Sequence, residues 1–204
     1  LGEMMIASRH GNFPVKAGDK IAGTRVIPLV IHEDKMKKAK EVAGEEPIFR
    51  IRPYTKKKVG IIATGSEIYR GRIQDTFTPV VREKLAEYGI TETDHVICDD
   101  DHRMITEEIE VMLEKGCNMV ICTGGMSVDP DDRTPLAIKN TGADIVTYGA
   151  PVLPGAMFML AYYDSVIPVM GLPGCVMYAK RTIFDLVLPR IMTGEKLKAK
   201  DLNL

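Results

Sequence analysis

Three short glycine-containing segments of the chain could hold a phosphorylated ligand. They are residues 64–67 (TGSE), 123–127 (TGGMS) and 171–175 (GLPGC), and each follows an apolar run. Glycine lets backbone N–H groups approach an anion closely, and serine and threonine hydroxyls can donate further hydrogen bonds to phosphate oxygens. One such segment is usually only a turn. Three in equivalent positions predict an anion-binding site.

Acidic residues gather beside the same segments. They are Glu67, Asp75, Asp99, Asp100, Asp101, Asp129, Asp131 and Asp132. A site for phosphate alone would avoid this much negative charge. Mg²⁺ binds one or two carboxylates together with ligand oxygens, so a bound Mg²⁺ would bridge the acidic residues and the phosphate. For Asp101 and Asp131 we favour solvated turns or helix caps. For Glu67, Asp75, Asp100 and Asp132 the functional and the turn interpretations both stay open.

The common nucleotide-binding signatures are absent from the sequence. It has no G-x-x-x-x-G-K-[ST] motif, and no G-x-G-x-x-G opens a helix after a strand. These absences argue against a P-loop NTPase and against a dinucleotide-dependent dehydrogenase.

The elements that must position these segments alternate between strand and helix. Apolar runs predict strands at 59–63, 93–98 and 118–123, and helical periodicity predicts helices at 75–88, 105–116, 132–140 and 176–192. Residues 156–163 and 165–171 predict a hairpin around Asp164 and Ser165. This alternation indicates an α/β fold, a three-layer α/β/α sandwich with a mostly parallel sheet. The glycine segments then lie at the carboxyl ends of strands, where open α/β sheets bind ligands.

The first part of the chain has a different character. Residues 21–31 are rich in β-branched side chains, residues 33–43 predict a short polar helix, and Pro47 and Pro53 bracket one more predicted strand. Nothing in this part could bury a sizeable core. We therefore expect residues 1–55 to be a small β-rich segment, the remnant of an upstream domain plus a linker, and residues 56–204 to form the ligand-binding domain. A start at Leu1 suggests an excised fragment.

Composition narrows the class of protein. The 204 residues are 45% hydrophobic and 27% charged, with a formal net charge of −1, so no global field attracts nucleic acid or an anionic membrane. No apolar run approaches the roughly 18–20 residues of a membrane span. Four cysteines without a CxxC pair indicate reduced thiols in a cytoplasmic protein. His95, Cys98 and His102 have ligand-like spacing but lack a fourth soft ligand, which argues against structural zinc.

Five motifs in order, TGSE, GRIQDT, CDDD, TGGMS followed by Asp132, and GLPG, resemble the molybdopterin-binding domain family. That family includes the molybdopterin molybdotransferases of the MoeA and gephyrin type, the adenylyltransferases of the MogA type, and the CinA proteins. The resemblance spans about residues 58 to 193 and is nearest to the MoeA-like molybdotransferases, whose preceding stretch residues 1–55 also resemble. It implies a MogA-like fold.

The resemblance also implies ligands and roles. It places the phosphate of molybdopterin, free or adenylylated, on Thr64, Gly65, Ser66, Thr123, Gly124, Gly125, Ser127, Pro173 and Gly174. It assigns catalysis to Glu67, Asp75, Asp100 and Asp132, with Glu67 and Asp100 as ligands of Mg²⁺. The implied reaction is cleavage of adenylylated molybdopterin with insertion of molybdate. A homo-oligomer and a molybdenum-enzyme client are the implied partners, with no nucleic acid and no membrane.

Four departures from the family pattern bear on catalysis. Asp129 stands where the family usually has glycine, Phe77 and Cys175 each stand where it usually has asparagine, and Ala156 stands where the molybdotransferases usually carry lysine. Three hypotheses therefore stay open: a molybdotransferase-like enzyme, a non-catalytic carrier or sensor of the cofactor, and a CinA-like domain that acts on another nucleotide-like ligand.

Overall fold

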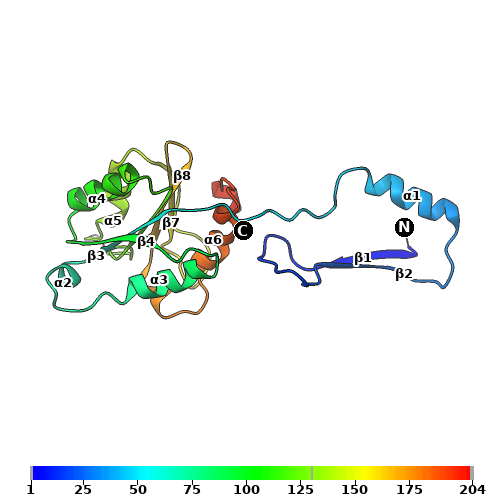
Figure 1. The fold of residues 1–204 in the computed structure, drawn as a ribbon, viewed down its shortest axis with the longest axis horizontal. Helices are drawn as coiled ribbons and strands as arrows, with labels where there is room; N and C mark the ends of the chain where they lie inside the picture. The colour runs from blue at the N-terminus through cyan, green and yellow to red at the C-terminus, as the bar shows by residue number, and fades with distance from the viewer. Residues whose placement is uncertain (1, 130, 203–204) are drawn as a thin grey trace. The chain divides into compact units, whose positions relative to one another are not determined.

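The computed structural model describes residues 2–129 and 131–202 and divides the chain into two compact units, Leu1–Pro53 and Tyr54–Leu204. Figure 1 shows the elements of each unit. No helix in the described ranges is long and apolar enough to cross a membrane.

The N-terminal unit holds one strand pair and one helix. Strand β1 (Met4–Ser8) pairs antiparallel with β2 (Ala22–Val26), and α1 (Glu33–Ala43) confirms the predicted polar helix. None of the residues described in this unit is buried. The strand predicted between Pro47 and Pro53 is wrong. Its residues join no ladder here, and without a neighbouring strand their backbone groups have no sheet partner.

The C-terminal unit is built on a six-stranded sheet in the order β4-β3-β5-β8-β7-β6. Its strands are β3 (Val59–Thr64), β4 (Thr93–Cys98), β5 (Met119–Thr123), β6 (Asp144–Tyr148), β7 (Met159–Tyr163) and β8 (Ile167–Leu172). Strands β4, β3, β5 and β8 are parallel, whereas β7 runs antiparallel to both β8 and β6. The mostly parallel sheet and the predicted hairpin are confirmed.

Helices cover both faces of this sheet (Figure 1). Helices α3 (Phe77–Ala86) and α6 (Ile183–Met192) pack in one apolar cluster with Val59 and Ile61 of β3. Helices α4 (His102–Glu114) and α5 (Thr134–Asn140) pack in a second cluster with Ile62. Alternate residues of β3 thus serve opposite layers, and its uniformly apolar sequence follows from burial on both sides. The three-layer sandwich is confirmed.

Three local predictions need correction. The long helix predicted at 176–192 is two pieces, a 3₁₀ turn η1 (Gly174–Met177) and α6, because Thr182 has an extended backbone and forms a capping box with Asp185 that starts a new helix. Strand β6 was not predicted. Helix α5 begins at Thr134 instead of residue 132, and its Pro135 lies in the first turn as expected.

A buried ion pair joins helix α3 to the start of α6. Lys84 Nζ lies 2.7 Å and 2.9 Å from the two carboxylate oxygens of Asp185, and both side chains are less than a tenth exposed. The same carboxylate accepts a hydrogen bond from the Thr182 N–H at 2.7 Å. Asp185 therefore stabilises the beginning of α6 and also compensates the charge of Lys84, which this layer encloses.

Removal of Lys84 should leave the Asp185 carboxylate without its buried counter-charge. We expect Lys84→Met to lower the free energy of unfolding by about 3 kcal/mol, because the Asp185 carboxylate stays buried. Urea denaturation measures this. Arg181 also contacts Asp185, at 3.3 Å, but its side chain is 58% exposed, so Arg181→Met is the matched control and should cost less than about 1 kcal/mol. Equal losses for both variants would contradict this account.

Candidate functional site

The three glycine segments leave the sheet at one level. Ala63 of β3 is in register with Thr123 of β5, which is in register with Leu172 of β8. The residues that follow therefore emerge side by side from adjacent parallel strands. This is the arrangement expected from the sequence, and it produces a row of loops along one edge of the sheet.

The first loop is fixed to the end of the edge strand β4. Gly65 has φ +146°, a conformation that side chains rarely adopt, and its N–H donates to the carbonyl oxygen of Cys98 at 3.2 Å. Ser66 opens the short helix α2 (Ser66–Tyr69), and its hydroxyl donates to the carboxylate of Asp99. This hydrogen bond is the main reason that the pKa of Asp99 is lowered.

The first and second loops approach each other at Gly124. A Cβ at this position would lie 2.3 Å from the carbonyl oxygen of Thr64, and the φ of Gly124 is +91°. The Thr134 hydroxyl donates to the carbonyl oxygen of Gly124 at 2.8 Å and lies 3.4 Å from the Thr64 hydroxyl. Thr134 is fully buried and begins α5. One threonine therefore ties both loops to a helix N-terminus.

The rest of the second loop lies across the ends of β8 and β6. Met126 is buried over Gly171, where a Cβ would meet its sulfur at 2.6 Å. Beyond it, the Tyr148 hydroxyl donates to the carbonyl oxygen of Ser127 at 3.4 Å. Asp132 closes the loop by accepting hydrogen bonds from the Ser127 N–H at 2.5 Å and from its hydroxyl at 2.8 Å.

Carboxylates that follow β4 and carboxylates of the second glycine loop lie close together around Asp100. Burial and the nearby charges of Asp132 and Asp99 raise the pKa of Asp100. A Cβ at Gly125 would lie 3.2 Å from Asp100 Oδ1, so this carboxylate sits against the second glycine loop. A cation would relieve such a concentration of negative charge. Within residues 2–129 and 131–202 no three histidine, cysteine or acidic side chains are grouped closely enough to hold a metal by themselves.

Asp75 and Glu67 differ from that group. Asp75 accepts hydrogen bonds from the N–H groups of Phe77 at 2.9 Å and Thr78 at 3.0 Å, and its other oxygen lies 3.2 Å from His95 Nε2. Burial raises the pKa of Asp75, but these hydrogen bonds outweigh it, so the pKa is lowered. Asp75 thus stabilises the start of α3. Glu67 is exposed on α2, and its carboxylate has no hydrogen bond or ion pair with the described residues.

Other predicted residues can be placed individually. Thr123 is only 1% exposed and its hydroxyl has no hydrogen-bond partner among the described residues, so a ligand would meet its backbone at most. Asp101 caps α4 by accepting hydrogen bonds from Arg103 and Met104, as the capping interpretation predicted. Asp131 is 92% exposed. These positions contribute less to the site than their place in the motifs suggests.

The third loop starts with buried Pro173 and exposed Gly174, the first residue of η1. Cys175, which follows, is half-buried, whereas Cys98, Cys117 and Cys122 are buried. Burial raises the pKa of Cys98 to about 12 and that of Cys117 to about 11, and it also raises the pKa of Cys122.

Three residues that hold the loops together had no role in the predicted site: Asp99, Thr134 and Tyr148. The sequence placed Asp99 among the acidic residues beside the loops, and its position directly after β4 could have assigned it a role. Thr134 precedes Pro135, which marks the first turn of a helix, so its place at the start of α5 could have been predicted. No sequence signal pointed to Tyr148, because β6 was itself unrecognised.

Comparisons with known proteins show a family for the C-terminal unit. Residues 60–193 match the family described as "Probable molybdopterin binding domain". The chain is 32% identical over 77 residues to a CinA-like protein from Mycobacterium tuberculosis. These 77 residues are 38% of this chain but only 18% of that relative. The chain thus spans about a fifth of the length of this curated relative.

Two solved structures share the fold. The molybdopterin biosynthesis enzyme MoaB from Thermus thermophilus superposes with a TM-score of 0.51 at 22% identity, over 70% of this chain and 100% of that one. The tungsten cofactor synthesizing protein MoaB from Pyrococcus furiosus gives 0.53 at 18% identity, over 67% of this chain and 92% of that one. At this identity the likeness establishes the fold alone.

The contact between the first two loops should tolerate no side chain. Gly124→Ala would force the Thr64 carbonyl to move and would strain the backbone, so we expect unfolding to become easier by about 3 kcal/mol or more. Gly142→Ala is the matched control: its φ of +78° is equally unfavourable, but nothing lies within 4 Å of the new Cβ, and the cost should be about 1 kcal/mol. Chemical denaturation of both variants measures the loss in free energy of unfolding. Equal losses would contradict a close contact between the two loops.

The raised pKa of Asp100 gives a pH dependence of defined sign. Between the ordinary carboxyl pKa and the raised value, the folded protein binds more protons than the unfolded chain, so stability falls as pH rises through that window. Asp100→Asn should therefore raise the Tm at pH 7 by on the order of 1 °C and flatten this decline. Thermal melts from about pH 4 to pH 7 measure it. Asp101→Ala should instead lower the Tm, because Asp101 caps α4. An Asp100→Asn variant less stable than the parent at pH 7 would refute the assignment.

Proposed function

Because the chain belongs to the molybdopterin-binding domain family, we propose that it binds molybdopterin or adenylylated molybdopterin and acts in Mg²⁺-dependent insertion of molybdate. The observation that supports this most directly is the close approach of the first two glycine loops, at Gly124 and Thr64. It brings backbone N–H groups and the hydroxyls of Ser66 and Ser127 to one edge of the sheet, where they suit a phosphate group.

The carboxylates next to these loops fit a hard cation. Asp100, with Asp132 and Asp99 close enough to raise its pKa, offers the oxygen ligands that Mg²⁺ prefers, and the remaining positions would go to water and ligand oxygens. Glu67 is the second ligand that the sequence predicted, and its exposed side chain is unengaged by other described residues. When bound, Mg²⁺ would neutralise phosphate charge and so favour cleavage of the adenylyl group.

The residues of this chain would contribute binding and orientation. The Ser66 hydroxyl donates to Asp99 and the Ser127 hydroxyl donates to Asp132, so in this proposal each hydroxyl exchanges its carboxylate for a phosphate oxygen when the ligand binds. Asp75 acts in this proposal by fixing the start of α3 and the loop that precedes it. The homo-oligomer and the molybdenum-enzyme client are proposals that follow from the family resemblance.

A second candidate function is supported by the CinA-like relative, which shares 32% identity over 77 residues. In that case the same loops would bind the phosphate of a different nucleotide-like ligand. A third candidate, a non-catalytic carrier or sensor of the cofactor, follows from the departures at Asp129, Phe77, Cys175 and Ala156. The three differ in ligand affinity and turnover.

Pterin fluorescence should separate these functions. We expect saturable binding of molybdopterin and of its adenylylated form, followed by release of AMP when Mg²⁺ and molybdate are added. Ser127→Ala should weaken binding about tenfold, since it removes one hydrogen bond to a charged group. Glu67→Ala and Asp132→Ala should abolish AMP release. Asp131→Ala, an exposed acidic residue on the same loop, is the control and should match the parent.

Each alternative outcome identifies a different candidate. Tight binding of both pterins without AMP release would establish a carrier or sensor. Absence of affinity for either pterin would reject the proposal and favour the CinA-like function. Release of AMP that survives both Glu67→Ala and Asp132→Ala would retain the activity but reject these residues as its catalysts.

A further inference from the structure

An open cavity lies at the end of the sheet opposite to the candidate site. It measures about 270 Å³ and is lined by the turn between β7 and β8, by the segment that follows α6, and by Lys57. Strand β8 starts at this end and finishes at the glycine loops, so the whole sheet separates the two places. We call it the basal cavity and define it by Lys57, Tyr162, Val166, Pro168, Ile191 and Lys196.

The floor of the basal cavity is apolar and well fixed. Tyr162 is 3% exposed and Ile191 is 2% exposed, whereas Val166 is 73% exposed. The Tyr162 hydroxyl accepts a hydrogen bond from the Leu197 N–H at 3.0 Å, which holds the segment after α6 beside the sheet. Such a floor can receive the hydrocarbon part of a small ligand.

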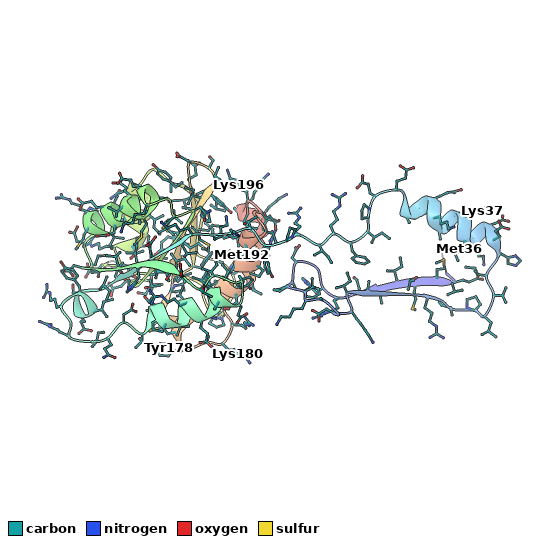
Figure 2. The ribbon with its side chains drawn as sticks, viewed as in Figure 1. Met36, Lys37, Tyr178, Lys180, Met192 and Lys196 are labelled. Atoms are coloured by element: carbon teal, nitrogen blue, oxygen red, sulfur yellow. The ribbon has the colours of Figure 1, made fainter. Side chains whose placement is uncertain are left out.

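Two lysines that form no ion pair with the described residues line the same cavity. In the described parts of the chain, no carboxylate lies within ion-pair distance of Lys57 or Lys196. Lys57 is half-buried, and this burial lowers its pKa. Lys196 Nζ lies 5.5 Å from the centre of the Tyr162 ring, and Figure 2 shows Lys196 just beyond the end of α6 that carries Met192.

The acidic residue of the cavity is already engaged. Glu195 accepts hydrogen bonds from Arg190 at 2.8 Å and 3.1 Å, and Arg190 also lies 3.3 Å from Asp201. The carboxylate therefore compensates Arg190, and the two lysines leave a net positive charge above an apolar floor. Partial removal of an ammonium group from water without a partner is unfavourable, and a bound anion would offset that cost.

We propose that the basal cavity binds a small organic anion, with a carboxylate or phosphate head facing Lys57 and Lys196 and an apolar body against Tyr162, Pro168 and Ile191. The volume lies just below the roughly 300–1,000 Å³ of typical small-molecule sites, so the body has about ten non-hydrogen atoms. Lysine acts as a point charge and accepts either head group. This site is independent of the proposed function at the opposite end of the sheet.

Three probes of one shape test the proposal: benzoate, phenyl phosphate and neutral benzamide. The ¹⁵N-labelled full chain is titrated with each and followed by NMR. Benzoate or phenyl phosphate should shift the amide signals of Ser165, Val166 and Gly194 saturably, with a Kd of about 1 mM, whereas benzamide should bind at least tenfold more weakly. Binding of only one anion would support the site and identify its head group.

Charge-removing variants locate the interaction. Lys57→Gln and Lys196→Gln should each weaken anion binding about threefold or more, and the double variant at least tenfold. Lys56→Gln is the matched control, since Lys56 is exposed and does not line the cavity, and should bind like the parent. Benzamide binding as tightly as benzoate, unsaturable shifts with both anions, or shifts confined to residues 64–67 and 123–127 would each overturn the proposal.

Discussion

The structure of the candidate site depends on the absence of one side chain. At Gly124 the second loop passes so close to the Thr64 carbonyl that only glycine fits, and the Thr134 hydroxyl bridges the two loops from the start of α5. This junction sets the level of Ser127 and Asp132 on one side and of Ser66 on the other. Backbone groups at such a junction are aligned by the sheet itself, so a ligand need not order them on binding.

The three aspartates at this edge, Asp99, Asp100 and Asp132, differ in their hydrogen-bond partners. Asp99 and Asp132 each accept a hydrogen bond from a serine hydroxyl. The bond from Ser66 lowers the pKa of Asp99, whereas burial and the neighbouring carboxylates raise the pKa of Asp100. The three aspartates therefore have two different roles. Asp99 and Asp132 hold serine side chains in place by accepting hydrogen bonds from their hydroxyls, and Asp100 provides a position where a cation is favoured.

Much of the fold was predictable from sequence because its signals are local. Fully apolar runs identified β3 and β5, and the glycine segments identified the strand ends. Long-range pairing was harder. Strand β6 is recognisable only once β7 pairs with it, and the break before α6 depends on the capping box of Thr182 and Asp185. Within the site, motif position indicated Asp100 and Asp132. It could not show that Asp75 accepts hydrogen bonds from the first residues of α3 or that Thr123 is enclosed.

The distribution of the thiols has a practical consequence. Three of the four cysteines are buried with raised pKa values, whereas Cys175 is partly accessible on the third loop, at the edge that carries the candidate site. An alkylating reagent at neutral pH will therefore modify the native protein at one position, since thiolate formation and access are both suppressed elsewhere. A fluorophore attached there would report from the ligand edge without any engineered cysteine.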